Sequence, residues 1–383
     1  MKKYLVAAAA FCVLASAAFA QPKVLKIGIF EPLSGDSGAI GKQEALGIRY
    51  ANALTPTVDL PDGTYNIEFV YADNQSSTDK APTAAQHLVS EGVSLVIGAA
   101  GSAVTIAGSP YFGDAGIPAI TATATNPQVT LGNTHYFRVC FLDPFQGVVL
   151  ANYAYKELGA RSAYCLAELG NDYDIGLVHY FKEAFIALGG KVIDDTFPNG
   201  TSDFSSYLTN AANYGADVFF FPVTIAYSTQ VIAQAASSGC KIPLLGSDIF
   251  DSGKVLEIIK GTDLSLVISA YYQEGAAPEF DAGYKAWLNS DSELLKTNGG
   301  NDIICAASAM GFDAYNVAIA AIKLAGSADP KKINEALWKT TLVGASGAIA
   351  FDEVGDALRD SAILKKADTV NGTWEFLKIQ KID

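Results

Sequence analysis

The chain is poor in the residues on which many enzymes and nucleic-acid-binding proteins depend. Its 383 residues include 3 histidines and 2 methionines, and 26 Lys and Arg stand against 40 Asp and Glu, for a formal charge of −14. Surfaces for nucleic acid or anionic membranes need clustered Lys and Arg, so this balance argues against both. Half of the residues are apolar, which excludes a disordered chain, and the length indicates about two domains.

Catalytic and cofactor motifs are also missing. The run GDSGAIGKQ at 35–43 mimics a phosphate loop, but five residues separate its outer glycines, and Gln43 replaces the Ser or Thr that would bind magnesium. No G-x-G-x-x-G follows an expected strand, and no G-x-S-x-G occurs. His87, His135 and His179 lie far apart, without metal-ligand spacing. We therefore expect no enzyme, no metal and no cofactor.

The first twenty residues have the layout of a cleaved secretory signal. Lys2 and Lys3 precede an uncharged, mostly apolar run over 4–16, and Ala-Phe-Ala at 18–20 fits a signal-peptidase site. A membrane anchor is the alternative, but the run is short for the ~20 residues that a span needs. We expect a soluble exported protein that begins near Gln21 and has no segment inserted in the membrane.

Cysteines are few in that mature chain. An exported protein can hold disulfides, but these cysteines lie far apart and none belongs to a C-x-x-C pair, so zinc and thioredoxin-like readings lack support. Buried free thiols are favoured over disulfides. The residues concerned are Cys140, Cys165, Cys240 and Cys305.

Short apolar runs alternate with helical segments along the chain. Continuous apolar runs such as 93–98 and 218–223, with helical stretches such as 79–91 between them, are typical of parallel strands covered on both faces. The alternation starts again after about residue 143. We therefore expect two doubly wound α/β units, with a ligand in the cleft between them, beyond the carboxyl ends of the strands.

Several short motifs occur along the chain in an order and spacing that are informative together. Pro32-Leu33-Ser34-Gly35 follows the first strand, and ITATATNP occupies 120–127. Arg138 is followed by Asp143, Gln146 and Gly147, and FDEVGD occupies 351–356. Each motif alone is weak. Together, in this order and spacing, they resemble the substrate-binding proteins of branched-chain amino-acid ABC transporters, over nearly all of the mature chain.

The resemblance implies a type I periplasmic binding fold, with two doubly wound parallel-sheet lobes joined by three crossovers. It also implies a monomer that captures a small neutral α-amino acid, first of all a branched-chain one, in the periplasm. The partners implied are the permease and ATPase subunits of an ABC transporter. We place the crossovers near 140–142, 270–273 and 345–350. Lobe 1 would comprise 21–140 and 273–346, and lobe 2 would comprise 141–272 and 347–383.

A free α-amino acid carries a carboxylate and an ammonium group, and burying either one unpaired costs several kcal/mol. By the resemblance, the Ser102 hydroxyl and the start of its helix hold the carboxylate. The Thr125 hydroxyl would bond either charged group, and the Thr123 carbonyl would accept from the ammonium. Helix capping is the structural alternative for Ser102 and Thr125.

The resemblance completes the site with three residues of the second lobe. Asp143 and Asp248 would face the ammonium, and Tyr173 would pack over the ligand backbone. Each has a plainer alternative: Asp143 as a helix N-cap, Tyr173 as ordinary core and Asp248 as a turn residue.

The side-chain pocket departs from the family pattern. Ile40 and Thr224 stand where branched-chain binders have aromatic residues, so we expect a rebuilt pocket lined by Ile40, Thr224 and either Phe312 or Met310. An amide, urea, an aromatic acid or a nucleoside remains an alternative ligand, although two carboxylates would repel a simple acid. An exported sensor that presents its ligand to a receptor remains an alternative role.

Overall fold

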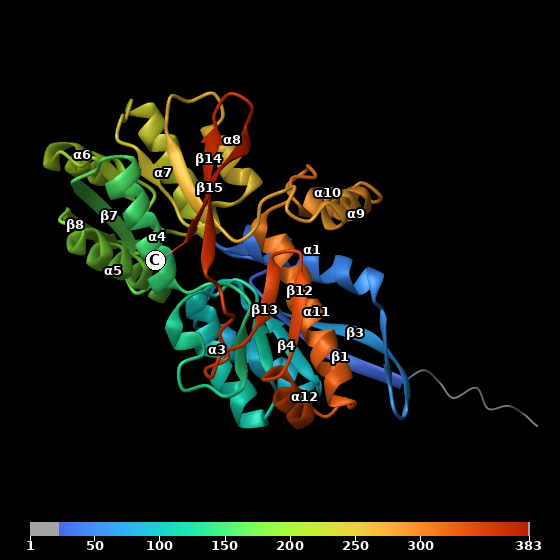
Figure 1. Cartoon of the computed structure of the whole chain (residues 1–383). Coiled ribbons are helices and arrows are strands. Elements are labelled where there is room, and N and C mark those ends of the chain that lie inside the picture. Colours follow the sequence, from blue (N-terminus) through green and yellow to red (C-terminus); the bar gives the residue numbers. More distant parts are fainter. Residues whose placement is uncertain (1–22, 382–383) are drawn as a thin grey trace, which may run out of the picture.

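The computed structural model describes residues 23–381, so the expected signal segment lies outside the described residues. Two sheets organise the chain into two bodies, one above the other in Figure 1. The first sheet has the order β2-β3-β1-β4-β5-β6, and only β2 runs antiparallel to its neighbour. Its strands are β1 (Lys23–Glu31), β2 (Thr57–Leu60), β3 (Gly63–Asp73), β4 (Leu95–Gly98), β5 (Ala119–Thr121) and β6 (Tyr136–Arg138).

The second sheet has the order β15-β14-β11-β10-β9-β7-β8, with a parallel centre and β14 and β15 antiparallel at one edge. Strands β9, β10 and β11 are buried and apolar apart from Ser269, as expected for strands covered on both faces. The strands are β7 (Ser162–Glu168), β8 (Lys191–Phe197), β9 (Val218–Phe220), β10 (Leu244–Leu245), β11 (Leu266–Ala270), β14 (Ser361–Asp368) and β15 (Thr373–Lys381).

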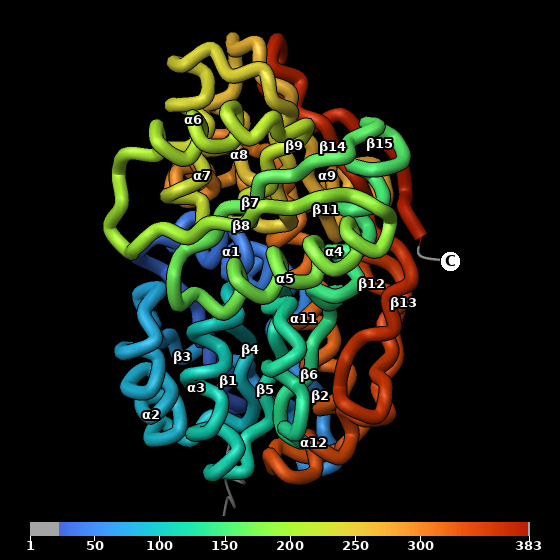
Figure 2. Tube along the Cα trace, turned by 90° about the vertical axis from the view of Figure 1, so that its left-hand side faces the viewer, coloured from blue at the N-terminus to red at the C-terminus, as the bar shows by residue number. Residues whose placement is uncertain are grey.

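Helices cover both faces of each sheet (Figure 2). Those beside the first sheet are α1 (Gly38–Leu54), α2 (Ala81–Ser90), α3 (Ser102–Ala115), η1 (Pro127–Val129), α9 (Pro278–Leu288), α10 (Ser292–Thr297), α11 (Ala306–Ala325) and α12 (Pro330–Leu337). Those beside the second are α4 (Asp143–Asn152), η2 (Tyr153–Glu157), α5 (Asp172–Ala187), α6 (Ser205–Tyr214), α7 (Ile225–Ser237), η3 (Asp248–Phe250) and α8 (Gly253–Ile259).

Glycines allow α1 and α11 to pack closely beneath the first sheet. A side-chain carbon on Gly47 would overlap the carbonyl of Ser308, and one on Gly311 would overlap the carbonyl of Glu44. Small residues are therefore required where these two backbones meet. The contact fixes the position of α1, whose first turn begins just after the loop that follows β1.

The chain passes between the two sheets three times. It leaves the first sheet after β6 and enters α4, and it returns after β11 toward α9. The third passage lies later than the expected 345–350. Strand β13 (Gly347–Ala350) pairs with β12 (Thr341–Gly344), and Asp356 forms a bridge with Arg138. Residues 347–357 therefore lie with the first sheet, not with lobe 2.

Side-chain contacts explain this correction. Asp313 of α11 accepts hydrogen bonds from the backbone N–H groups of Ala345 (2.7 Å) and Ser346 (2.8 Å), which holds the β12–β13 turn onto the first body. The buried Arg138 guanidinium donates to Asp356 Oδ1 at 2.7 Å. The chain joins the second sheet only at Ser361.

The cysteines of residues 23–381 are free, as expected. Cys140, Cys165 and Cys305 are buried and Cys240 is half-buried. Among the same residues, no helix is both long and apolar enough to cross a membrane.

Candidate ligand-binding cleft

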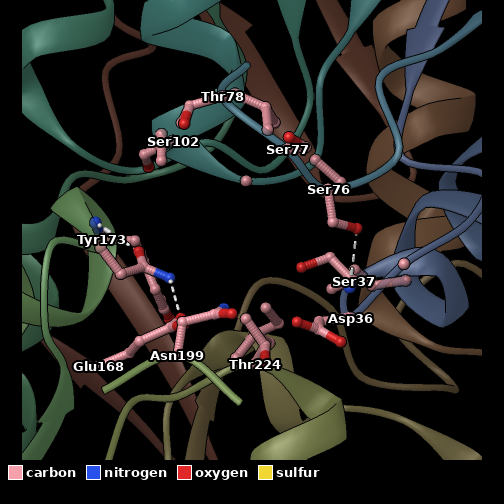
Figure 3. A pocket seen from close by; sticks show the side chains of 18 of the residues that line it. Asp36, Ser37, Ser76, Ser77, Thr78, Ser102, Glu168, Tyr173, Asn199 and Thr224 are labelled. Atoms are coloured by element: carbon pink, nitrogen blue, oxygen red, sulfur yellow. Dashed lines mark hydrogen bonds between the residues drawn. The ribbon is translucent and has the colours of Figure 1, made fainter. Parts of the chain in front are cut away.

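A cavity of about 490 Å³ opens between the two bodies (Figure 3). Its walls are loops that follow the carboxyl ends of strands in both sheets, which is where open α/β folds bind ligands. The first body contributes the loops after β1, β3, β4 and β5. The second contributes the loops after β7, β8, β9 and β10.

Six of the nine residues in our sequence-based site prediction lie on this cavity. They come from segments far apart in the chain, and the topology brings them together at the strand ends. They are Ile40, Ser102, Thr123, Tyr173, Thr224 and Asp248.

Asp248 lies on the wall formed by the second sheet and is 4% exposed. Its Oδ1 accepts hydrogen bonds from Gln146 Nε2 (2.5 Å) and the Tyr173 hydroxyl (2.8 Å), and its Oδ2 accepts one from the Tyr271 hydroxyl (2.6 Å). Burial raises the pKa of the carboxyl, and these three donors oppose the rise. A carboxylate oxygen can accept two hydrogen bonds, so Oδ2 can still take one from a ligand.

Tyr173 stands in the first turn of α5, where Asn171 caps the helix by accepting from the N–H groups of Tyr173 and Asp174. The Tyr173 hydroxyl lies 2.8 Å from both the Ser247 hydroxyl and Asp248 Oδ1. It can accept from the first and donate to the second. These contacts hold the ring at the cavity wall.

Ser102 is the first residue of α3, and its hydroxyl accepts from the backbone N–H of Asn126 at 3.1 Å. Gly101 precedes it and supplies no side chain to cap the helix. The first N–H groups of α3 therefore face the cavity wall without a capping side chain, an arrangement that favours an anion such as a carboxylate.

Thr125, Asp143 and Phe312 do not line the cavity. Phe312 instead packs among the aromatic rings of Tyr50 (5.7 Å between centroids) and Phe280 (4.8 Å). Met310, the alternative to Phe312, lines a smaller cavity at the passages between the sheets.

Asp143 is fully buried at the start of α4, and neither of its carboxyl oxygens has a hydrogen-bond partner in the part of the chain that the structure describes. Its backbone N–H donates to the carbonyl of Thr125 at 3.0 Å. Burial raises the pKa of Asp143 to about 8, although the neighbouring Thr125 hydroxyl acts in the opposite direction. The carboxyl is therefore mostly protonated at neutral pH, which does not suit a partner for an ammonium group.

Sequence reasoning missed several polar residues of the cavity, among them Asp36, Ser76, Glu168 and Asn199. Glu168, the last residue of β7, accepts hydrogen bonds from Asn171 Nδ2 (3.1 Å) and Asn199 Nδ2 (2.7 Å). Asp36 lies across the opening, and its pKa is raised by burial and by the Glu168 charge. Each of these four residues follows or ends a strand, and that position is the sequence feature that could have identified them as residues of the cavity.

The cavity wall carries negative charge without a compensating cation. Four carboxyl groups line it, from Asp36, Asp79, Glu168 and Asp248, and no Lys, Arg or His among the described residues does. Such a wall attracts a ligand with a positive group and disfavours one that is only negative. In residues 23–381, no group of three or more His, Cys, Asp or Glu is arranged to hold a metal ion.

Comparison with curated proteins places this chain among bacterial solute binders. The family model described as periplasmic binding protein matches residues 24–367. The Leu/Ile/Val-binding protein homolog 3 of Brucella melitensis is 30% identical over 248 residues, which cover 63% of this chain and 65% of that relative. That alignment spans just under two thirds of the relative's length.

Solved structures agree over almost the whole chain. A leucine binding protein from Thermotoga maritima has 32% identity and a TM-score of 0.83, with 94% of this chain and 99% of that chain covered. A branched-chain amino acid transporter substrate binding protein from Streptococcus pneumoniae, in complex with isoleucine, has 25% identity and a TM-score of 0.82, with 94% and 100% covered. The expected type I periplasmic binding fold is thereby confirmed. This chain belongs to the periplasmic binding protein family.

Proposed function

We propose that this chain is an exported solute-binding protein that captures a neutral α-amino acid, first of all leucine, isoleucine or valine, and delivers it to an ABC permease. One observation carries the proposal: the uncapped N-terminus of α3 and the Asp248 carboxylate lie on opposite walls of one cavity. An α-amino acid is the small solute whose two charged groups match such a pair.

Recognition follows from this pair. The ligand carboxylate is held by the first N–H groups of α3 and by the Ser102 hydroxyl, which retains a hydrogen to donate while it accepts from Asn126. The ammonium is held by Asp248 and by the backbone carbonyl of Thr123. Tyr173 packs over the ligand backbone, and Ile40 and Thr224 contact its side chain.

A simple aromatic acid fits this site less well. It would bring a carboxylate without an ammonium into a cavity that the described residues line with four carboxyl groups and no cationic side chain. Burying an extra negative charge there without a partner is costly. The same reasoning favours a zwitterion over urea or an amide, because a neutral ligand would leave Asp248 without a counter-charge.

The transport role rests on closure of the two bodies about the three passages between them. Among the described residues, two hydrogen bonds outside these passages join the bodies: from Asn126 Nδ2 to the carbonyl of Asp172 at 2.9 Å, and from the backbone N–H of Ala306 to Asp251 Oδ2 at 3.0 Å. We propose that the mature protein, without residues 1–20, works as a periplasmic monomer. The energy for transport then comes from the ATPase subunits of the transporter.

The proposed ligand class can be tested without choosing a ligand in advance. The purified protein is denatured, and the released small molecules are identified by mass spectrometry. We expect a branched-chain or other neutral amino acid in near-stoichiometric amount. Release of a solute that lacks an ammonium group would contradict the proposal. Permease and ATPase genes beside the coding gene would favour transport over a sensor role.

A further inference from the structure

Two buried carboxyl groups lie directly behind the cavity wall of the first body. Glu31 is the last residue of β1 and Glu44 belongs to α1, and both side chains are fully buried. The cavity wall itself does not include either of them. No part of the proposed binding chemistry uses them.

Each carboxyl uses one oxygen to hold a loop of the cavity. Glu31 Oε2 accepts a 2.8 Å hydrogen bond from the backbone N–H of Ala100, in the loop after β4. Glu44 Oε2 accepts a 2.7 Å hydrogen bond from the Thr123 hydroxyl, in the loop after β5. Ala100 and Thr123 both line the cavity.

The remaining oxygen of each carboxyl, Oε1, is buried and has no hydrogen-bond partner among residues 23–381 outside the pair. Burial raises the pKa of both carboxyls, and the Glu44 charge together with a hydrogen bond between the two side chains raises that of Glu31 further. Two buried carboxylates without a cation cannot both be ionised at this distance, because their repulsion adds to the cost of desolvation. A proton held between them satisfies both orphan oxygens, with Glu31 donating to Glu44.

The described residues around the two carboxyl groups provide no cation that could neutralise their negative charge. Among residues 23–381, neither carboxyl forms an ion pair with Lys, Arg or His. The pair acts on two other buried titratable groups: burial and the charge of Glu31 and Glu44 raise the pKa of Tyr136, and burial and the charge of Glu44 raise the pKa of Cys140. The Tyr136 hydroxyl donates to the carbonyl of Gly98 at 2.6 Å, and Gly311, which packs on Glu44 from α11, is uncharged.

We propose that Glu31 and Glu44 share one proton and act as positioning residues, holding the loops after β4 and β5 in the geometry that receives the ligand. Loss of that proton leaves two adjacent negative charges, which push the loops apart. Ligand affinity therefore falls at alkaline pH. Only this last statement rests on the proposed function, because it needs a ligand.

The shared proton is tested first without any ligand. Infrared spectroscopy of the wild type at neutral pH should show the C=O stretch of buried carboxylic acids, to which Asp143 also contributes, and Glu31→Gln should remove the component that Asp143→Asn leaves in place. Asp281→Asn is the matched control, because Asp281 is a buried carboxyl of α9 that accepts from the Tyr272 hydroxyl and the Gly275 N–H. This control should keep the band. If Glu31→Gln leaves the infrared spectrum unchanged, the shared proton is excluded.

The pH dependence of stability provides a second ligand-free result. The folded chain keeps a proton that unfolded Glu releases above about pH 4, so the wild-type Tm falls as pH rises from there. The amide of Glu31→Gln is a permanent donor, so its Tm should fall less steeply. Parallel Tm curves for the two proteins would overturn the proposal.

Positioning is tested by hydrogen exchange of residues 98–105. We expect protection in the wild type, retention in Glu31→Gln and loss of protection in Glu31→Ala, which removes the acceptor of the Ala100 N–H. Equal protection in all three would exclude a positioning role.

With L-leucine as the probe, the affinity of both proteins should fall toward about pH 10, because leucine loses its own ammonium proton, and the fall should be at least tenfold larger in the wild type than in Glu31→Gln. If leucine binds neither protein at any pH, the proposed ligand is wrong. The three ligand-free measurements still decide whether Glu31 and Glu44 share a proton and position the loops.

Discussion

The Tyr173 hydroxyl lies 2.8 Å from Oδ1 of Asp248, although the two residues are 75 positions apart in the chain. They stand in α5 and η3, the helical segments that follow β7 and β10 of the same sheet. Gln146 and Tyr271 complete a set of donors around the same carboxylate. A carboxylate so firmly held is preorganised for a cationic ligand group, since little is lost in ordering it on binding.

Replacing Asp248 by Asn keeps its size and removes its charge. If the carboxylate holds a desolvated ammonium, affinity for L-leucine should fall by about 2–5 kcal/mol, measured by titration calorimetry. Asp281→Asn, which removes a buried carboxyl outside the cavity, is the control and should bind like the wild type. A loss below about 0.5 kcal/mol, the range of neutral surface changes, would exclude the ammonium role of Asp248.

Ser102→Ala removes the hydroxyl at the start of α3. We expect roughly a tenfold loss of leucine affinity, because about one hydrogen bond to the ligand carboxylate is lost. Ser109→Ala is matched to it, since Ser109 lies on the same helix and its hydroxyl accepts from Asn133 instead, at 3.3 Å. If the two variants weaken binding equally, the effect belongs to the helix and not to the site.

Asp143→Asn should change the stability of the fold without changing ligand affinity. Burial raises the pKa of Asp143 to about 8, so the folded chain holds a proton that the unfolded chain releases above about pH 4. This contribution to stability is complete below about pH 4 and is lost as pH rises toward 8. Urea unfolding should therefore find the Asn variant more stable than the wild type by a few kcal/mol at about pH 8, and less so at about pH 5.

The same variant decides whether Asp143 contacts the ligand. Its carboxyl does not line the cavity, so we expect leucine affinity close to that of the wild type. A loss as large as that of Asp248→Asn would return Asp143 to the ammonium site.

Asp356→Ala should be among the most destabilising single changes at the passages between the sheets. It leaves the Arg138 guanidinium, which is 0% exposed, without its carboxylate. We expect a loss of about 3–5 kcal/mol in the free energy of unfolding, because an uncompensated charge stays buried. The exposed pair of Lys241 and Asp263 is the control, and Asp263→Ala should change stability by less than about 1 kcal/mol. Equal losses of stability in the two variants would show that the buried Arg138–Asp356 pair contributes no more to the free energy of unfolding than an exposed ion pair.

The sequence predicted which end of the sheets carries the binding site, but it did not predict the direction of every side chain there. Apolar runs separated by helices predict parallel strands, and the ends of those strands indicate where a ligand binds. The family resemblance indicated Ser102, Tyr173 and Asp248, and each of them follows such a strand end. Thr125 and Asp143 lie at the same level but point into the interior. A strand end defines where the backbone of a residue lies in the fold. It does not define whether the side chain points toward the cavity or into the core.

Long-range pairing explains the other errors. The third passage was placed too early because the β12–β13 hairpin and the Arg138–Asp356 pair join the C-terminal segment to the first sheet. The Glu31–Glu44 pair had no sequence signal either. Thirteen positions separate the two residues, and only the packing of β1 on α1 brings their carboxyl groups together.

The most direct test of the proposed function is titration calorimetry of the purified mature protein with L-leucine, L-isoleucine, L-valine and benzoate. We expect saturable one-to-one binding of at least one of the amino acids and no heat of binding with benzoate. Binding of benzoate without any of the amino acids would contradict recognition of a zwitterion between α3 and Asp248.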